Sequence, residues 1–461
     1  MANAVSPTIF REYDIRGIVD KDLTEEAVEL VGKALGSQLA VEVGGAHRTI
    51  VVGRDCRVSG PRFAERMIAG LTSTGCDVVD LGVVPTPLTY FAAATLPVQG
   101  LCMITGSHNP PEYNGLKVGL GKNTLHGSGI QALRSRIAAG KFVRGERGRV
   151  STHDIVGPYR DYVGKNLQPG PRKLKVVVDA GNGTGGVVAV PLFQALGFDV
   201  VPLFLEMDGR FPNHHPDPTV EANLAHLKAK VLEVKTDLGI AYDGDADRVG
   251  AVDELGNVLW GDQLMILFAR ALLEEVPGAA IVGEVKCSMN LYDDIARKGG
   301  RPIMWRAGHS LIKAKMREEG ALLAGEMSGH IFFAHRWFGF DDGIYSSGRL
   351  LELLSRSDCP LSQLLADVPP TFASPEIRVD CPEEKKFEVV KRAQAFFSAR
   401  YETLTVDGVR VTFPDGWGLV RASNTQPLLV LRFEATSAVR LKEIEALVTG
   451  KVEELKREVG A

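Results

Sequence analysis

The chain has 461 residues, of which 45% are hydrophobic and 24% are charged, and its formal net charge is −4. At roughly 150 residues per domain this length predicts three or four domains, and the composition is that of a globular protein. The slightly negative charge argues against a nucleic-acid partner or an anionic membrane partner. No apolar run reaches the ~18 residues of a spanning helix, and the six cysteines include no C-x-x-C pair, so we expect a cytoplasmic protein.

A succession of strand, helix, glycine and strand occurs three times, beginning near residues 49, 175 and 280. It predicts α/β units and leaves open whether they are repeats. The proline-rich stretch 367–375 predicts a linker that lets the last domain close over a ligand. The expected domain limits are 1–152, 153–256, 257–368 and 369–461.

The last expected domain has a different pattern from the other three. A helix near 383–400 precedes four short strands, of which the first two are joined by the turn signal Asp407-Gly408. A final helix places six apolar side chains on one face, namely Leu441, Ile444, Leu447, Val448, Val452 and Leu455. This pattern predicts an α+β unit rather than a fourth copy.

The first loop with chemical potential is Thr105-Gly-Ser-His-Asn-Pro-Pro111, which follows an apolar run. Ser107 should project from the end of a strand, where ligands gather in open α/β sheets. No G-x-S-x-G surrounds it, so it is not a hydrolase nucleophile. A serine beside a cation and basic groups can carry a phosphoryl group covalently, and the alternative is an ordinary turn.

The second loop is Asp243-Gly-Asp-Ala-Asp-Arg248, again after an apolar run. Alternate residues of an extended segment face the same way, so the three carboxylates can converge on one hard cation. A calcium EF-hand is disfavoured because Arg248 stands at the sixth position, where the sharp turn needs glycine. Bound Mg²⁺, with Arg248 free to bind a phosphate, fits this chemistry better.

Two further loops carry polar groups. Gly325-Glu-Met-Ser-Gly-His330 offers Glu326 and Ser328 to the hydroxyls of a sugar. Arg421-Ala-Ser-Asn-Thr-Gln-Pro427 combines a guanidinium, hydroxyls and an amide, which suits a phosphate. Each of these loops, taken alone, is also compatible with a structural turn.

A glycine-rich segment suggests a competing function. Gly181-Asn-Gly-Thr-Gly-Gly186 fits G-x-G-x-x-G after a strand, and Glu206 lies at about the distance expected of a ribose-binding acid. This pattern would indicate an NAD-dependent sugar-phosphate dehydrogenase. It leaves Ser107 and the aspartates without a role, so a structural turn is preferred.

In this order and spacing the four loops resemble those of the α-D-phosphohexomutase superfamily, and the resemblance spans essentially the whole chain. Met327 and the segment 10–17 resemble the bacterial phosphomannomutase/phosphoglucomutase branch, whereas phosphoglucosamine mutases typically carry Gln in place of Met327. The resemblance implies three related α/β domains with mixed sheets around a central cleft. A C-terminal α+β domain like the TATA-binding-protein fold completes the expected architecture.

The resemblance also implies roles for individual residues. Ser107 is the expected phosphoserine, and with it Asp243, Asp245 and Asp247 are the expected Mg²⁺ ligands. Proton transfer is assigned to Lys117 or His330, and Arg248 and His108 complete the catalytic set. The expected substrate-binding residues are Tyr13, Arg16, Lys286, His309, Glu326, Ser328, Arg421, Ser423, Asn424 and Thr425.

The implied reaction interconverts hexose 1-phosphate and hexose 6-phosphate, of mannose or glucose or both, through the phosphoserine and a hexose 1,6-bisphosphate. If the protein does not contact the sugar O2, both hexoses should be accepted, because a change at that hydroxyl then leaves no polar group of the protein without a partner. The alternatives are a phosphoglucosamine mutase and the dehydrogenase above. A phosphosugar is the expected partner, and the chain is expected to be a monomer.

Overall fold

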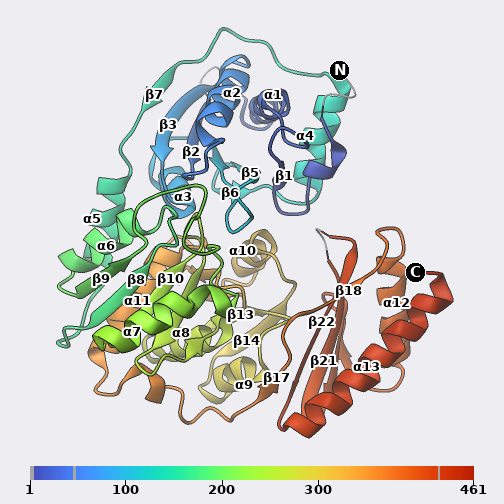
Figure 1. Ribbon diagram of the computed structural model, residues 1–461. Helices are drawn as coiled ribbons and strands as arrows, with labels where there is room; N and C mark the ends of the chain where they lie inside the picture. Colours follow the sequence, from blue (N-terminus) through green and yellow to red (C-terminus); the bar gives the residue numbers. More distant parts are fainter. Residues whose placement is uncertain (1–4, 45–47, 424–425) are drawn as a thin grey trace.

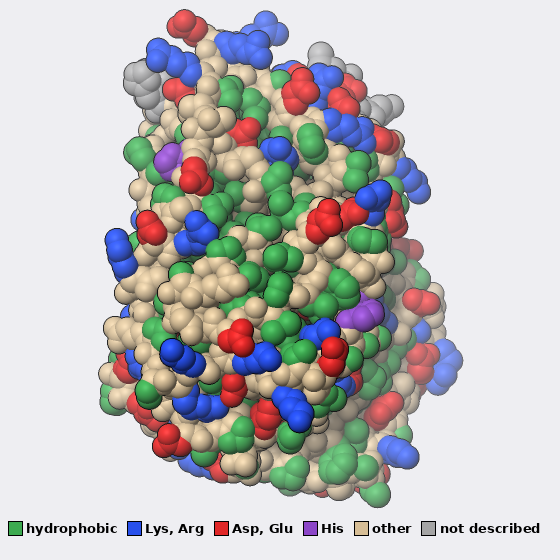
Figure 2. Space-filling model, turned by 60° about the vertical axis from the view of Figure 1, so that its left-hand side comes forward, with side chains coloured by type: hydrophobic (Ala, Val, Ile, Leu, Met, Phe, Trp, Pro, Cys, Tyr) green, Lys and Arg blue, Asp and Glu red, His purple; other side chains and the backbone are tan. Residues whose placement is uncertain are grey.

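The computed structural model describes residues 5–44, 48–423 and 426–461, which form four units, each built on one sheet (Figure 1). Along these residues no helix has both the length and the apolar character needed to cross a bilayer. The face in Figure 2 intersperses acidic and basic side chains with apolar ones.

The first unit contains a seven-stranded mixed sheet in the order β1-β5-β4-β2-β3-β7, with β6 paired to β5. Apolar side chains alternate along β2, so that Ile50 and Val52 face the core under α1, α2 and α4, while Val51 faces α3. The strands are β1 (Ile15–Ile18), β2 (Thr49–Arg54), β3 (Asp77–Val83), β4 (Gly100–Ile104), β5 (Tyr113–Leu120), β6 (Asn123–Thr124) and β7 (Val150–Thr152). The helices are η1 (Pro7–Ile9), α1 (Glu25–Val43), α2 (Gly60–Thr72), α3 (Thr86–Thr95) and α4 (Ser128–Ala139).

The second unit has a five-stranded sheet in the order β12-β11-β10-β8-β9. Val176 and Val178 of β8 face the core that contains α5 and α6, and Val177 faces α7. The strands are β8 (Lys175–Asp179), β9 (Asp199–Leu203), β10 (Leu238–Tyr242), β11 (Val249–Asp253) and β12 (Val258–Leu259). The helices are α5 (Val156–Asn166), α6 (Gly186–Ala195), η2 (Glu221–Leu224) and α7 (Ala225–Val234).

The third unit has a four-stranded sheet in the order β14-β13-β15-β16. Ile281 of β13 faces the core that contains α8 and α11, whereas Val282 faces α10. The strands are β13 (Ala280–Glu284), β14 (Arg301–Trp305), β15 (Leu323–Gly325) and β16 (Ile331–Phe333). The helices are α8 (Gly261–Glu275), α9 (Met289–Arg297), α10 (His309–Glu318), α11 (Gly343–Arg356) and η3 (Leu361–Gln363).

The fourth unit is an antiparallel sheet in the order β17-β22-β21-β20-β19, with β18 also paired to β22, and two helices cover one of its faces (Figure 1). The strands are β17 (Phe372–Ala373), β18 (Ile377–Asp380), β19 (Glu402–Leu404), β20 (Val409–Phe413), β21 (Gly416–Ala422) and β22 (Leu428–Ala435). The helices are α12 (Lys386–Ser398) and α13 (Ala438–Val459). The three mixed-sheet units and this α+β unit confirm the expected fold class.

The first three units share one strand topology. Each has three parallel strands in the spatial order second, first, third, followed by a fourth strand antiparallel to the third: β3-β2-β4-β5, β9-β8-β10-β11 and β14-β13-β15-β16. The three predicted successions correspond to the first two parallel strands of each unit, namely β2 and β3, β8 and β9, and β13 and β14. The units are therefore structural repeats. One continuous apolar core, containing α3, α5, α6, α8 and α11, joins them.

One detail of the sequence interpretation is wrong, and one is incomplete. The stretch 367–375, predicted to be a linker, joins the third and fourth units, and within it Phe372 and Ala373 also pair with β22, because an edge position tolerates the neighbouring prolines. Leu447 is 43% exposed, whereas Ile444, Val448, Val452 and Leu455 are buried. The helical period turns Leu447 roughly a quarter turn away from those four side chains.

The fourth unit docks on the third through Arg410. Its guanidinium is 3.7 Å from the ring centroid of Trp417, and it donates hydrogen bonds to the carbonyls of Val285 and Cys287. Trp417 Nε1 donates in turn to Glu434. Arg410 is 1% exposed, so its contacts cannot be replaced by water.

We expect Arg410→Met to lower the free energy of unfolding by about 2 to 4 kcal/mol, because two buried carbonyls lose their donor. Urea denaturation followed by tryptophan fluorescence measures the change. Arg378→Met is the control, since that side chain is 63% exposed on the same sheet. Equal stability of both variants would contradict this role for Arg410.

Candidate active site

The loop between β4 and β5 carries Ser107 in a strained backbone conformation. Its φ of 49° lies in the left-handed region, and its side chain is buried. Ser107 Oγ donates to Asp243 Oδ2 at 2.7 Å, and Ser107 N donates to Thr105 Oγ1 at 2.7 Å. The serine hydroxyl therefore points at the second loop from a fixed backbone.

Arg57, which follows β2, holds this loop in place. Its guanidinium donates to the carbonyls of Ser107 at 2.8 Å, Pro110 at 2.6 Å and Tyr113 at 2.8 Å. A Cβ at Gly106 would lie 2.3 Å from Arg57 Nε, so only glycine fits there. Arg57 thus stabilises the strained Ser107 loop through hydrogen bonds to its carbonyl groups.

The loop between β10 and β11 brings the three aspartates together. Asp243, Asp245 and Asp247 are fully buried, and one carboxylate oxygen of each lies within 4.8 Å of those of the other two. Ala246, at φ 57°, provides the sharp turn between the second and third of them. The three carboxylates therefore converge, as expected from their alternate positions in the sequence.

Lys117 of β5 binds one carboxylate oxygen of Asp245 and one of Asp247. Its Nζ donates to Asp245 Oδ2 at 2.8 Å and also to Asp247 Oδ2. Burial opposes the charge of Lys117, but the two carboxylates outweigh it and raise its pKa well above the usual value. Thr86 Oγ1 donates to the same oxygen of Asp245 at 2.6 Å.

The other carboxylate oxygens of these two aspartates have no such partner. Asp245 Oδ1 and Asp247 Oδ1 are buried and accept no hydrogen bond from any described residue. Burial, together with the charges of Asp245 and Asp247, raises the pKa of Asp243 well above its usual value. A buried, oxygen-only donor set with two oxygens unsatisfied fits a hard divalent cation.

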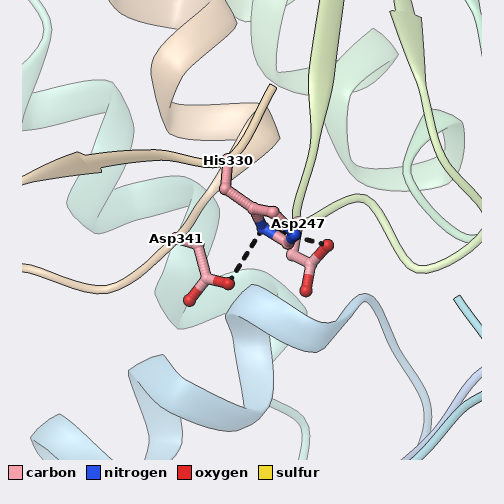
Figure 3. A group of neighbouring side chains, drawn as sticks. All are labelled: Asp247, His330 and Asp341. Carbon is pink, nitrogen blue, oxygen red and sulfur yellow. Dashed lines mark ion pairs between the residues drawn. The ribbon is translucent and has the colours of Figure 1, made fainter. Parts of the chain in front are cut away.

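The third loop joins β15 and β16 and meets the second loop directly. Arg248 and His330 form an isolated antiparallel bridge, and Arg248 Nε donates to His330 Nε2 at 2.9 Å. His330 also lies beside Asp247 and Asp341, at 3.6 Å and 3.1 Å from its Nδ1 (Figure 3). His330 is therefore in contact with the aspartate cluster.

The sugar-loop candidates lie beside α10. Glu326 Oε1 accepts a hydrogen bond from Gly308 N at 2.6 Å, and burial raises the pKa of Glu326. Ser328 is half-buried in the same loop. His309, at the start of α10, stacks on His330 with a centroid separation of 5.5 Å.

The fourth loop approaches the same region from the fourth unit. Arg421 Nε donates to Asp407 Oδ2 at 2.9 Å, and Asp407 Oδ2 also accepts from Ala307 N at 3.2 Å. Tyr13 OH donates to Ala307 O at 2.9 Å, so the first, third and fourth units meet here. Ser423 is buried, while Asn424 and Thr425 lie outside the described residues.

The remaining candidate residues lie in two places, on the Ser107 loop and near the fourth unit. His108 Nδ1 lies 3.1 Å from Ser107 Oγ, and burial, with Arg248 and Arg16 nearby, lowers the pKa of His108. Arg16 donates to Gly106 O at 3.4 Å on the same loop. Lys286, in contrast, lies near the fourth unit, with its Nζ 3.4 Å from Glu376.

The structure also contains supporting residues that the sequence interpretation missed. Arg57, Thr86 and Asp341 contact the predicted loops from distant positions, and no local pattern distinguishes them. The sequence indicates only a turn at Asp407, whereas in the structure Asp407 also accepts a hydrogen bond from Arg421.

The glycine-rich segment 181–186 has a packing role. A Cβ at Gly183 would lie 2.7 to 3.0 Å from the backbone of Gly244, and one at Gly185 would lie 2.8 Å from the Cβ of Ala246. These glycines let the segment pack against the aspartate loop, as expected of a structural turn.

Comparison with known proteins identifies the family. Family models described as phosphoglucomutase/phosphomannomutase, alpha/beta/alpha domains I, II and III, match residues 7–144, 158–256 and 260–372, and the C-terminal domain model matches residues 376–451. The phosphomannomutase/phosphoglucomutase of Pseudomonas aeruginosa is 47% identical and aligns with 97% of this chain and 96% of its own. The phosphoglucomutase of Neisseria gonorrhoeae is 45% identical, with 96% of each chain covered.

Solved structures agree with this result. A phosphoglucomutase/phosphomannomutase family protein from Burkholderia thailandensis superposes with a TM-score of 0.92 at 43% identity, covering 98% of both chains. Four consecutive family models and relatives of nearly the same length therefore place this chain in the phosphoglucomutase/phosphomannomutase family, within the bacterial branch of the α-D-phosphohexomutases.

Proposed function

We propose that the protein interconverts hexose 1-phosphate and hexose 6-phosphate, with mannose and glucose as its sugars, through a phosphoserine at Ser107 and a hexose 1,6-bisphosphate. The observation that carries this proposal is the contact of Ser107 Oγ with Asp243, 2.7 Å away, beside unsatisfied carboxylate oxygens. A phosphoryl group on that hydroxyl adds about −1.5 to −2 charge, so it requires a cation there. The names of the relatives support the same reaction.

Mg²⁺ is the proposed metal, held by Asp243, Asp245, Asp247 and the phosphorylated Ser107. When bound, it neutralises charge on the transferring phosphoryl group. Lys117 binds Oδ2 of Asp245 and of Asp247 and leaves their Oδ1 atoms without a hydrogen bond, so these Oδ1 atoms would be available as metal ligands. Because the N–H groups of Lys117 are engaged by carboxylates, we assign proton acceptance to His330 rather than to Lys117.

In the proposed transfer, a sugar hydroxyl oxygen bonds to phosphorus while the bond from phosphorus to Ser107 Oγ breaks. The hydroxyl proton passes to His330, and Oγ regains a proton, for which His108 lies within 3.1 Å. Arg248, which contacts His330 at 2.9 Å, is placed to bind the moving phosphoryl group. The second half-reaction runs these steps in reverse on the other end of the bisphosphate.

The other candidate residues are proposed to hold the sugar and its non-transferring phosphate. Glu326 and Ser328 would bind sugar hydroxyls, and the fourth loop would bind the phosphate through Arg421, Ser423, Asn424 and Thr425. Tyr13, Arg16, Lys286 and His309 complete the substrate-binding set. The partner is a phosphosugar, and the cytoplasmic location and monomeric state stay predictions from the sequence.

Ser107→Ala should lower kcat by about 1,000-fold or more, because the phosphoryl acceptor is removed. A coupled assay for glucose 6-phosphate formation measures this, and mannose 1-phosphate and glucosamine 6-phosphate are tested alongside. Labelled glucose 1,6-bisphosphate should transfer its phosphate to the wild type but not to the variant. Ser73→Ala is the control, and full activity of Ser107→Ala would refute the mechanism.

Asp243→Asn should abolish the rise in Tm that Mg²⁺ produces, because a charged ligand is lost. Since the pKa of Asp243 is raised, protons compete with the metal as the pH falls through that pKa, so Mg²⁺ should bind more weakly at lower pH. Thermal unfolding with and without Mg²⁺ measures the Tm rise. Calorimetric titration of the metal-free protein at several pH values measures the Mg²⁺ affinity. Asp208→Asn is the control, and pH-independent binding would contradict the assignment.

Arg421→Met should raise KM by about 10- to 150-fold, since one charge-assisted contact to the non-transferring phosphate is lost. Steady-state kinetics on glucose 1-phosphate measures the effect, with Arg378→Met as the control. An unchanged KM would show that Arg421 does not bind the substrate phosphate.

A further inference from the structure

A cavity of about 570 Å³ lies in the third unit between α8 and α11, two helices that pack against each other (Figure 1). The C-terminal halves of both helices line it, together with Lys298 after α9 and Leu364 after η3. Its volume falls in the range of small-molecule sites, about 300 to 1,000 Å³. The described residues that line it include none from the four loops of the candidate active site. The cavity is therefore a separate place with room for a small molecule.

Arg349 of α11 brings a buried positive charge to the wall of this cavity. It is 5% exposed, and its Cζ lies 4.6 Å from the ring centroid of Phe333. Its Nη1 donates to the Tyr345 hydroxyl at 3.2 Å and to the His335 carbonyl at 3.4 Å. Both acceptors are uncharged, so these hydrogen bonds do not neutralise the guanidinium.

The acidic side chains nearest along the cavity wall are engaged elsewhere. Arg336 donates to Glu352 from both terminal nitrogens, at 2.8 and 3.0 Å, and Glu275 lies 3.6 Å from His335. Among the residues that the structure describes, no carboxylate forms an ion pair with Arg349. A buried charge without a counter-ion is unfavourable, so this guanidinium favours an anion from outside the chain.

Two donors of Arg349 remain available for such an anion. Nε and Nη2 donate to no described residue, and solvent reaches both of them. These two nitrogens share one edge of the guanidinium, which matches the two oxygens of a carboxylate. Arg270, in the same cavity wall, uses this edge, since its Nε and Nη2 donate to the two carboxylate oxygens of Asp294 at 2.9 and 2.7 Å. Arg349 presents the same edge without a partner.

We propose that this cavity binds a small monocarboxylate with an apolar body, whose carboxylate pairs with Nε and Nη2 of Arg349. Ala271, Leu353 and Leu364 line the cavity and are half-buried, so they present apolar surface to that body. The inference does not depend on the mutase function, because no residue of the proposed catalytic or substrate-binding set takes part.

The charges around the cavity favour a monoanion over a phosphate dianion. Only Arg349 offers a buried guanidinium without an ion pair among the described residues of the lining. The lining also contains Glu274 and Glu275, which are exposed, and a second negative charge on the ligand would be repelled by them. A single carboxylate therefore matches the site better than a phosphate ester.

The test uses benzoate as the probe, with benzamide as its neutral counterpart and phenyl phosphate as the dianion. Calorimetric titration of the full chain should give a Kd for benzoate on the order of 1 mM, which is ordinary for so small a ligand. Benzamide and phenyl phosphate should bind at least about tenfold more weakly. Equal affinity for benzamide would show that the guanidinium is not used, and tighter binding of phenyl phosphate would overturn the ligand class.

Substitutions locate the benzoate within the chain. Arg349→Met should weaken benzoate binding by about tenfold or more, because both paired donors are lost. Arg356→Met is the matched control on the same helix and cavity wall, where the side chain is 44% exposed, and it should change the Kd less than about threefold. Arg421→Met should also leave the Kd unchanged, and loss of binding in that variant instead would place the benzoate in the fourth loop and overturn the proposal.

A second route does not require a change at the buried arginine. Ala271→Phe fills the cavity from α8 and leaves Arg349 intact, so it should also weaken benzoate binding by about tenfold or more. Crystals of the wild type soaked in 4-bromobenzoate should show anomalous bromine signal between α8 and α11, with the carboxylate on Nε and Nη2. Unchanged benzoate affinity in Ala271→Phe, or bromine signal only at other places, would overturn the proposal.

Discussion

Three carboxylates, from Asp243, Asp245 and Asp247, share one fully buried site, and their mutual repulsion constrains everything around them. Ionised groups without water must be paired, because burial alone costs several kcal/mol per charge. Lys117 binds the Oδ2 atoms of Asp245 and Asp247, and their unsatisfied Oδ1 atoms suit a divalent cation. The phosphoryl group proposed for Ser107 would lie beside Asp243 and would need such a cation, so the charge balance of the aspartate loop limits what the serine can carry.

The repeated topology explains how the loops of three units reach one place. In each unit the functional loop joins the third strand to the antiparallel fourth strand: β4 to β5, β10 to β11, and β15 to β16. The shared apolar core fixes the units relative to one another, and the bridge between Arg248 and His330 ties two of the loops together. The same position in the strand order thus contributes Ser107, the three aspartates, and Glu326 with Ser328.

The sequence was sufficient to predict the fold class and the four loops, because each loop is a compact polar motif after an apolar run. It was not sufficient for residues that act across long separations. Thr86 bonds to Asp245 from 159 positions away, and Arg57 supports the backbone of Ser107 from 50 positions away. Asp341 is adjacent to Asp342, and only the packing of α10 and β16 distinguishes their contacts. Tertiary packing, rather than local pattern, decides such assignments.

The fourth unit differs from the others in how it is held. Its main apolar core is separate, and its contacts to the third unit include the small cluster at Trp417 and the polar contacts of Arg410 and Asp407. The proposed reaction requires a bisphosphate to turn round, so under that proposal the fourth loop must loosen while the aspartate cluster stays fixed. Three units joined by one core, with a fourth unit that has a core of its own, suit both requirements. In this scheme Arg421 would move with the fourth unit while Asp243, Asp245 and Asp247 stay in place.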